Sequence, residues 1–121
     1  MNTIWIVPIE PIDSRYTRQW YDNIPILIRQ AGGGKWQVKT VDGEQIKSGT
    51  STGGFLDWGA TNVYKATQTA AIGRLFSSGA VQAGDRFLVT DAWNFVITAI
   101  RYMSDLMQIP VEIHGIWHAG A

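Results

Sequence analysis

Four runs of apolar or alternating residues are separated by segments of helical periodicity, so the chain predicts strands and helices in alternation. The first run, residues 3–9, is almost continuously apolar, which is typical of a strand covered on both faces. Residues 35–43 alternate and end in Asp-Gly, which predicts a second strand entering a tight turn, with residues 44–48 returning as a hairpin. Short apolar runs predict two further strands, at 85–91 and 111–117.

Three helices are expected between these strands. Asp13 or Ser14 can cap the first, and Pro25 is expected to kink or restart it because proline lacks an amide donor. A glycine-rich loop at 47–62 precedes the second helix. The residues expected to face inward are Tyr16, Trp20 and Ile24 in the first helix; Val63, Ala66, Ala70 and Leu75 in the second, at 63–78; and Trp93, Val96, Ile97, Ile100, Met103 and Met107 in the third, at 92–108.

The alternation of strands and helices predicts an α/β fold. We expect a three-layer, Rossmann-like domain with a mostly parallel sheet of about four strands, right-handed crossovers and helices on both faces. No repeat or low-complexity run divides the chain, so residues 1–121 are interpreted as one domain. Because the chain stops just after the last predicted strand, that domain is expected to be the N-terminal part of a longer protein.

Composition narrows the functional classes. Ten basic and ten acidic side chains cancel, so the overall charge does not indicate a nucleic-acid partner. No cysteine is present, which excludes disulfides and thiolate chemistry and suits a cytoplasmic location. The apolar N-terminal run is too short for a membrane span and lacks the basic region of a signal peptide, so we expect no membrane association. No metal motif occurs, and we expect neither a metal nor a cofactor.

Polar residues gather where the predicted strands end. In open parallel sheets, ligands bind beyond the carboxyl ends of the strands, which makes these positions the candidate site. The residues are Glu10, Asp13, Arg15, Asp57, Asp91, Asn94 and His118.

Several of these residues have both a structural and a functional interpretation. Asp91 precedes the third helix and is expected to be its N-cap, which still directs its carboxylate to the sheet edge. Arg15 can hold a phosphate or carboxylate, or form a surface ion pair with Asp13 or Asp22. His118 can carry a proton, whereas His114, inside the last strand, is interpreted as a hydrogen-bonded core residue.

The glycine-rich loop supplies a weaker candidate. Its backbone amides could surround a phosphate, although it lacks the sequence of a P-loop and the glycine spacing of a dinucleotide site. The residues of this candidate phosphate-binding loop are Ser51, Thr52, Gly53 and Gly54.

Two stretches carry a resemblance to a known family. Residues 7–21, "VPIEPIDSRYTRQWY", and 91–120, "DAWNFVITAIRYMSDLMQIPVEIHGIWHAG", resemble the N-terminal Rossmann-like half of GT-B glycosyltransferase-like proteins of phage and marine origin. The resemblance implies a half that holds the sugar acceptor, with the nucleotide-sugar donor held by a missing domain or another chain. It implies Asp91 or His118 as the general base. The residues implied to shape the acceptor pocket are Glu10, Asp13, Arg15, Trp93 and Asn94.

Three functions therefore stay open. The first is the acceptor-binding part of a glycosyltransferase, with a nucleotide-sugar or sugar-like partner. The second is a small Rossmann-like or flavodoxin-like module that binds a nucleotide or phosphorylated metabolite through Arg15 and the loop at 48–54. The third is an interaction protein without catalysis, whose last strand and exposed tryptophans pair with a second copy or another subunit.

Overall fold

The chain forms a four-stranded parallel sheet with three helices. The computed structural model describes residues 1–12, 16–46 and 58–117. The elements in chain order are β1 (Thr3–Val7), α1 (Tyr16–Ala31), β2 (Gln37–Thr40), α2 (Trp58–Ser77), β3 (Arg86–Val89), α3 (Val96–Met107) and β4 (Glu112–Gly115). Strands and helices alternate throughout, which confirms the predicted fold class.

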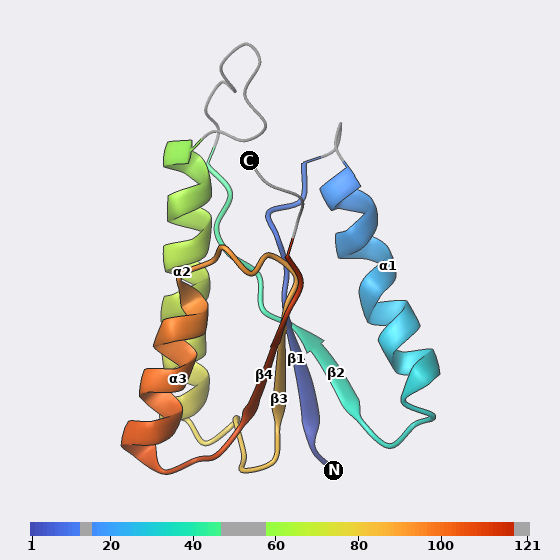
Figure 1. The fold of residues 1–121 in the computed structure, drawn as a ribbon, viewed down its shortest axis with the longest axis vertical. Coiled ribbons are helices and arrows are strands. Elements are labelled where there is room, and N and C mark those ends of the chain that lie inside the picture. Colours follow the sequence, from blue (N-terminus) through green and yellow to red (C-terminus); the bar gives the residue numbers. More distant parts are fainter. Residues whose placement is uncertain (13–15, 47–57, 118–121) are drawn as a thin grey trace.

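The sheet has the strand order β2-β1-β3-β4, and every neighbouring pair is parallel. Helix α1 lies on one side of the sheet, and α2 and α3 lie together on the other (Figure 1). This is a small three-layer Rossmann-like domain. Its strand order is that of the flavodoxin-like arrangement, in which the chain leaves β1 toward one edge and β3 toward the other.

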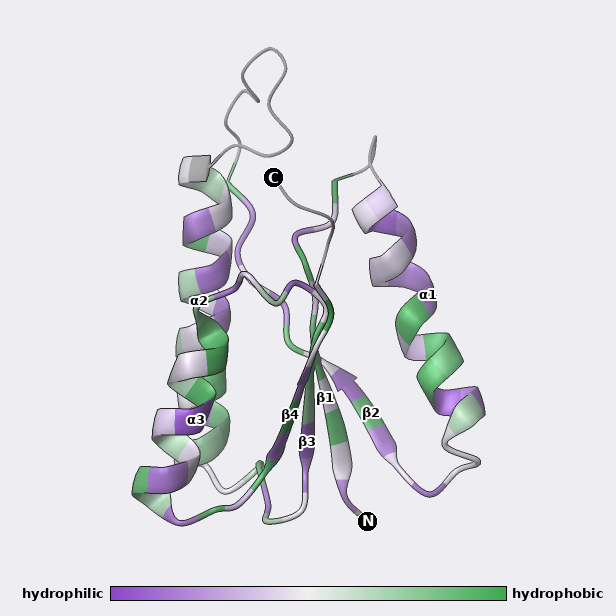
Figure 2. Ribbon diagram, in the orientation of Figure 1, coloured by the Kyte–Doolittle hydropathy of each residue, from purple (hydrophilic) through white to green (hydrophobic). Residues whose placement is uncertain are grey.

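The main core lies between the sheet and the α2–α3 pair. It is built on a row of stacked rings, in which Phe87 of β3 lies 6.4 Å from Trp5 of β1 and 6.1 Å from Phe76 of α2, measured between ring centroids. Figure 2 shows apolar residues interleaved with hydrophilic ones on the helices, as expected for helices that cover a sheet with one side only. The buried residues of this core are Trp5, Val7, Val41, Ile72, Phe76, Val81, Phe87, Val89, Val96, Ile100 and Val111.

The inward face of α2 differs from the prediction. Ala66 and Ala70 are exposed, and Val63 and Leu75 are only half-buried. The residues that point to the sheet are Tyr64, Gln68, Ile72 and Phe76, at a regular spacing of four. A buried glutamine interrupts the apolar series, so the sequence pattern favoured the alanine positions instead.

Helix α1 also presents a different face. It runs through Pro25 without a break, so the predicted restart is wrong. Thr17 and Pro25 are buried, whereas Tyr16 is 40 % exposed and packs edge-on against Trp20. The proline ring faces the sheet, and its burial compensates for the missing backbone hydrogen bond.

Up to residue 46, where the description of this segment ends, β2 is not followed by a hairpin. Residues 41–46 form no strand, and β2 pairs with β1 alone among the described strands. Gly43 is explained by packing rather than by a turn, because a Cβ atom there would lie 2.8 Å from the ring of Tyr64. The Asp-Gly pair therefore marks a close approach between the segment after β2 and helix α2.

A buried aspartate fixes the amino-terminal end of the sheet. Oδ1 of Asp85 accepts hydrogen bonds from the Thr3 amide and the Asn2 side chain, and Oδ2 accepts from the Trp5 indole and the Gln82 amide, all at 2.9 to 3.0 Å. Burial alone would raise the pKa of Asp85, but these four donors hold it below its ordinary value.

The last strand is an edge strand rather than a buried one. His114, expected in the core, is exposed and lies 3.3 Å from the Glu112 carboxylate through its Nε2 atom. The register places Glu112 beside Arg86 and His114 beside Leu88, on the side of the sheet that α2 and α3 do not cover. Among the described helices, none has the length and apolar character needed to cross a membrane.

Candidate functional site

The direction in which the chain adds strands to the sheet reverses between β1 and β3. The chain passes from β1 to β2 on one side and from β3 to β4 on the other, so the segments leaving β1 and β3 separate at the carboxyl end of the sheet. In folds of this kind ligands bind at such a switch point. Five polar residues lie at this end of the sheet: Glu10 after β1, Lys65 and Gln68 on α2, and Asp91 and Asn94 after β3. We call them the switch-point cluster.

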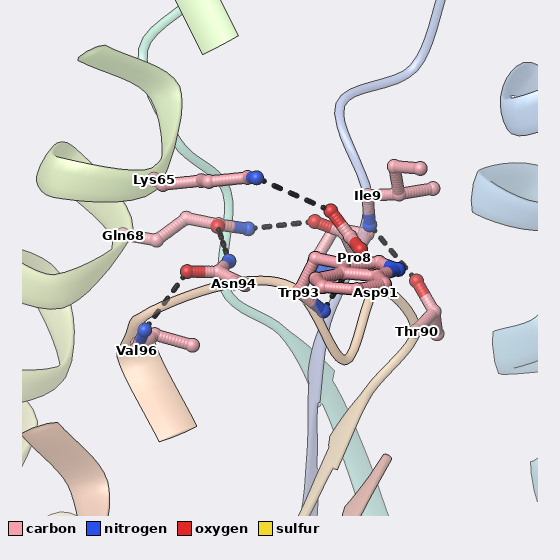
Figure 3. A network of polar contacts seen from close by, with 9 residues as sticks. All are labelled: Pro8, Ile9, Lys65, Gln68, Thr90, Asp91, Trp93, Asn94 and Val96. Atoms are coloured by element: carbon pink, nitrogen blue, oxygen red, sulfur yellow. Dashed lines mark hydrogen bonds and ion pairs between the residues drawn. The ribbon is translucent and has the colours of Figure 1, made fainter. Parts of the chain in front are cut away.

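Asp91 holds the centre of this cluster. Its Oδ1 atom accepts a hydrogen bond of 3.1 Å from the Trp93 amide, and its Oδ2 atom lies 3.4 Å from Nζ of Lys65 (Figure 3). The side chains of Asp91 and Lys65 are only 7 % and 13 % exposed to solvent. The ion pair therefore joins α2 to the segment after β3 in a largely dry environment.

The predicted helix-capping role of Asp91 is wrong. Helix α3 begins at Val96, with Phe95 at the N-cap position and no side-chain cap bond, five residues after Asp91 in the sequence. Asp91 instead closes a turn, because its side chain binds the Trp93 amide and its carbonyl accepts from the Asn94 amide at 3.0 Å. Aspartate commonly forms such local turns, which compete with helix initiation.

Asn94 and Gln68 form the framework beneath the ion pair. The Asn94 side-chain amide donates to the Gln68 side-chain oxygen at 2.9 Å, and its own oxygen accepts from the Val96 amide at 2.9 Å. The Gln68 amide in turn donates to the carbonyls of Pro8 and Val41. Both side chains are buried, and every polar atom of Asn94 has a protein partner, so Asn94 supports the cluster from below.

Thr90 adds a second link between the two strands. Its hydroxyl oxygen accepts a 2.8 Å hydrogen bond from the Ile9 amide, while its own amide donates to the Val7 carbonyl at 3.1 Å. The chain after β1 is therefore fixed against the chain after β3 beyond the last regular ladder position. Glu10, the next residue, is held in a defined place and is 5 % exposed.

Two tyrosines near the cluster have raised pKa values, mainly because they are partly removed from water. Burial raises the pKa of Tyr64 on α2 well above its usual range, and the charge of Asp42 and, to a smaller extent, that of Glu10 add to this shift. Burial, followed by the charge of Asp91, raises the pKa of Tyr16 at the start of α1. Asp91 therefore acts electrostatically on α1 while it pairs with α2.

A buried hydroxyl group lies near the amino-terminal end of α2. The side-chain oxygen of Thr61 is buried and has no hydrogen-bond partner in the part of the chain that the structure describes. Thr61 and Lys65 are four residues apart and lie on one side of α2. This side of α2 therefore carries two polar side chains, those of Thr61 and Lys65, next to the apolar core.

Trp93 leaves the cluster and points to solvent. Its ring is 62 % exposed and meets that of Trp117, which is 67 % exposed, edge-on at 5.0 Å between centroids. The expectation that Trp93 faces the core is wrong, because the turn at Asp91 removes it from the helix. The pair lies beside an open groove of about 490 Å³ that follows β4 and α3, so the groove does not coincide with the switch-point cluster.

Several sequence candidates lie outside the described residues, which leaves their placement unassigned. They are Asp13, Arg15, Ser51, Thr52, Gly53, Gly54, Asp57 and His118. Of the others, Asp91 and Asn94 lie in one turn after β3, and Glu10 follows Ile9, whose amide is bound by Thr90. Within residues 1–12, 16–46 and 58–117, no group of three or more histidine, cysteine, aspartate or glutamate side chains could hold a metal ion.

Sequence reasoning missed Lys65 and Gln68. Both were assigned to a helix, but the alanine-rich face was expected to point inward, which left these two residues without a role. The available signal was the spacing of Thr61, Lys65 and Gln68 by four and three positions, which places polar groups on one side of a helix.

Comparisons with known proteins add no relative to this picture. Neither the protein-family models, the curated proteins nor the solved structures contain a match to this chain. The likeness to GT-B glycosyltransferase-like proteins consequently stays a prediction from residues 7–21 and 91–120.

Proposed function

We propose that the switch-point cluster binds the hydroxyl-bearing acceptor of a glycosyl transfer, with this domain serving as the acceptor-binding half of a GT-B-type enzyme. The observation that carries the proposal is the placement of Asp91. An ionised carboxylate offers about four acceptor positions, and the Lys65 ammonium and Trp93 amide occupy two of them. The remaining capacity suits a hydroxyl group.

The charges of the cluster favour a neutral polyol over a phosphate. Its described members contribute two carboxyl groups, from Glu10 and Asp91, and one ammonium group, from Lys65. A phosphate would meet more negative than positive charge here, whereas a sugar can donate to the carboxylates and accept from Lys65. The exposed ring of Trp93 adds a flat apolar surface beside Asp91.

Asp91 is assigned the role of general base in this proposal. The acceptor hydroxyl oxygen attacks the anomeric carbon of a nucleotide-sugar, the bond from that carbon to the phosphate oxygen breaks, and Asp91 takes the hydroxyl proton. The nucleoside diphosphate leaves with the electrons of the broken bond. The donor is supplied by another domain or another chain, and His118 stays the second candidate for the base.

Sugar binding by the isolated chain provides the test. Saturation-transfer NMR with a panel of simple sugars and glycosides should show contact, and Asp91→Asn should remove it. Because this change also breaks the ion pair with Lys65, circular dichroism of the variant must show that the fold is retained. Asp105→Asn, which alters an exposed carboxylate on α3, is the matched control and should leave binding unchanged. A panel without any contact, or equal binding by Asp91→Asn, would contradict the proposal.

A phosphate-binding module is the second candidate. The strand order β2-β1-β3-β4 favours it, since flavodoxin-like domains bind phosphorylated ligands at the same switch point. It predicts affinity for inorganic phosphate or nucleotides that depends on Arg15 and Gly53. Calorimetry with inorganic phosphate separates the two candidates, because the phosphate-binding module should bind it, whereas the sugar site around Asp91 carries more negative than positive charge and should not.

A further inference from the structure

We infer that β4 is a self-association edge, at which a second copy of this chain pairs antiparallel across a twofold axis. This interaction is independent of the switch-point cluster. Strand β4 ends the sheet on one side, and no described strand lies beyond it. The edge exposes backbone groups that another strand can satisfy, which is a common route to association.

The register of β4 identifies the free backbone groups. The amides of Glu112 and Ile116 donate to the carbonyls of Asp85 and Val89, so the even-numbered residues of this segment bond to β3. In a parallel ladder the intervening residues direct their amides and carbonyls away from that neighbour. Val111, Ile113 and Gly115 therefore present their backbone groups to the open edge. Pro110, which has no amide hydrogen, falls at an even position and does not interrupt it.

Among the antiparallel registers that place odd-numbered residues opposite one another, three pair at least two of Val111, Ile113 and Gly115 with each other. One places Glu112 opposite Glu112 of the second copy, and another places His114 opposite His114. The third is centred on Ile113 and places Glu112 opposite His114 in two symmetry-related pairs. Only this register is complementary in charge when His114 is protonated, and it retains a carboxylate–imidazole hydrogen bond when His114 is neutral.

The exposed side chains suit this register. Glu112 and His114 retain 59 % and 55 % of their side-chain exposure and lie on the same face of the sheet. They occupy a non-hydrogen-bonded position of the new pair, where side chains on opposite strands approach most closely. Nε of Arg86 lies 3.0 Å from the Glu112 carboxylate, so in this register each Glu112 is shared between Arg86 of its own copy and His114 of the other. The register centred on Glu112 brings two carboxylates together instead, and the register centred on Ile113 is therefore favoured.

The groove along β4 fits the same arrangement. A twofold axis perpendicular to the sheet places both copies of α3 on one face, so the two grooves, each lined by Ile97, Thr98, Arg101 and Ile113 among others, face each other over the junction. The result is a continuous eight-stranded sheet with an isologous interface, made from an edge that would otherwise be open.

Charge reversal on β4 tests the pairing. Sedimentation velocity should show dimers of the wild-type chain whose proportion rises with concentration. His114→Glu places two carboxylates opposite each other and should raise the dissociation constant about tenfold or more, because both symmetry-related pairs change together. The double variant Glu112→Gln, His114→Gln removes both charges, keeps a side-chain hydrogen bond across the pair and places no like charge beside Arg86, so it should retain the dimer. Glu44→Lys, an exposed change at the other side of the sheet, is the control.

Hydrogen exchange supplies a second readout that does not depend on substitution. No described strand of the monomer pairs with the amides of Ile113 and Gly115, so their exchange should slow as protein concentration rises. A wild-type chain that stays monomeric at high concentration would overturn the inference. So would dimers that His114→Glu leaves unchanged, with the Ile113 amide exchanging freely.

Discussion

Nζ of Lys65 lies 3.4 Å from Oδ2 of Asp91, and both side chains are almost completely buried. The pair joins α2 to the segment after β3 at the switch point between β1 and β3. Because each charge has been removed from water, the loss of either partner leaves the other uncompensated.

The first prediction concerns this ion pair. Lys65→Met should lower the free energy of unfolding by about 3 kcal/mol, since the buried carboxylate loses its counter-charge. The double variant Lys65→Met, Asp91→Asn should be more stable than the sum of the single changes predicts. Urea unfolding of the four proteins at neutral pH measures the coupling. Strictly additive effects would show that the two groups do not interact.

The second prediction concerns acid stability. Because four donors hold the pKa of Asp85 below its ordinary value of 3.8, its carboxylate stabilises the fold above that value. The stabilisation is lost as the pH falls through the lowered pKa of the folded state. In Asp85→Asn, the NH₂ group of the new side chain faces N–H donors that it cannot accept from. The free energy of unfolding should therefore fall by about 2 kcal/mol at neutral pH.

Unfolding at pH 7 and at about pH 3 checks this relationship, because the wild-type advantage over Asp85→Asn should shrink at the lower pH. Asp105→Asn removes an exposed carboxylate that pairs only with Arg101 on the surface, and it should change little at either pH. A gap between wild type and Asp85→Asn that is constant with pH would exclude the proposed linkage.

A third prediction uses the close packing at Gly43. Gly43→Ala places a methyl group 2.8 Å from the Tyr64 ring and against the backbone of α2, so it should destabilise the fold by about 2 kcal/mol. Gly73→Ala is the matched control in α2, because its new methyl group meets only Met103 at 3.6 Å and improves helix propensity. It should stabilise the protein by about 0.5 kcal/mol. Thermal unfolding distinguishes the two outcomes.

The fourth prediction concerns alkaline pH. The Tyr21 hydroxyl donates a 2.6 Å hydrogen bond to Asp42, and this bond, followed by burial and the charge of Asp42, raises the pKa of Tyr21 to about 12. A raised pKa stabilises the folded state below the ordinary value of 10.0, and this contribution disappears as the pH rises toward 12. Tyr21→Phe should therefore cost about 1 kcal/mol at pH 8.

Absorbance titration of tyrosinate and unfolding at increasing pH test this assignment. The cost of Tyr21→Phe should decrease between pH 10 and pH 12. Tyr102→Phe, at an exposed position of α3, provides the comparison and should not alter stability. Ionisation of Tyr21 at its ordinary pKa would show that the Asp42 contact does not persist in solution.

Hydrophobic patterning predicted the order of the elements because each strand and helix has a strong local signal. It failed where a polar residue is buried or a proline is tolerated. Gln68 is inaccessible because it binds the carbonyls of Pro8 and Val41, partners that no local pattern reveals. Pro25 stays within α1 because its ring packs inward, which the sequence alone does not indicate.

The candidate site was predictable to the extent that strand ends are predictable. Glu10, Asp91 and Asn94 follow β1 and β3, and parallel pairing brings them to one edge. Lys65 was not predicted, since its contact with Asp91 depends on the rotation of α2 about its own axis. The rotation follows from the ring stacking of Phe76 on Phe87, a tertiary interaction between distant segments.

The pairing of β1 with β3 also has a consequence for folding kinetics. Val7 lies beside Val89 in the sheet although most of the chain separates them, so the loop between them must close before the switch-point cluster exists. Local formation of a helix cannot assemble Glu10 and Asp91. The ion pair between Lys65 and Asp91 will therefore form only late in refolding, and its formation marks completion of the sheet.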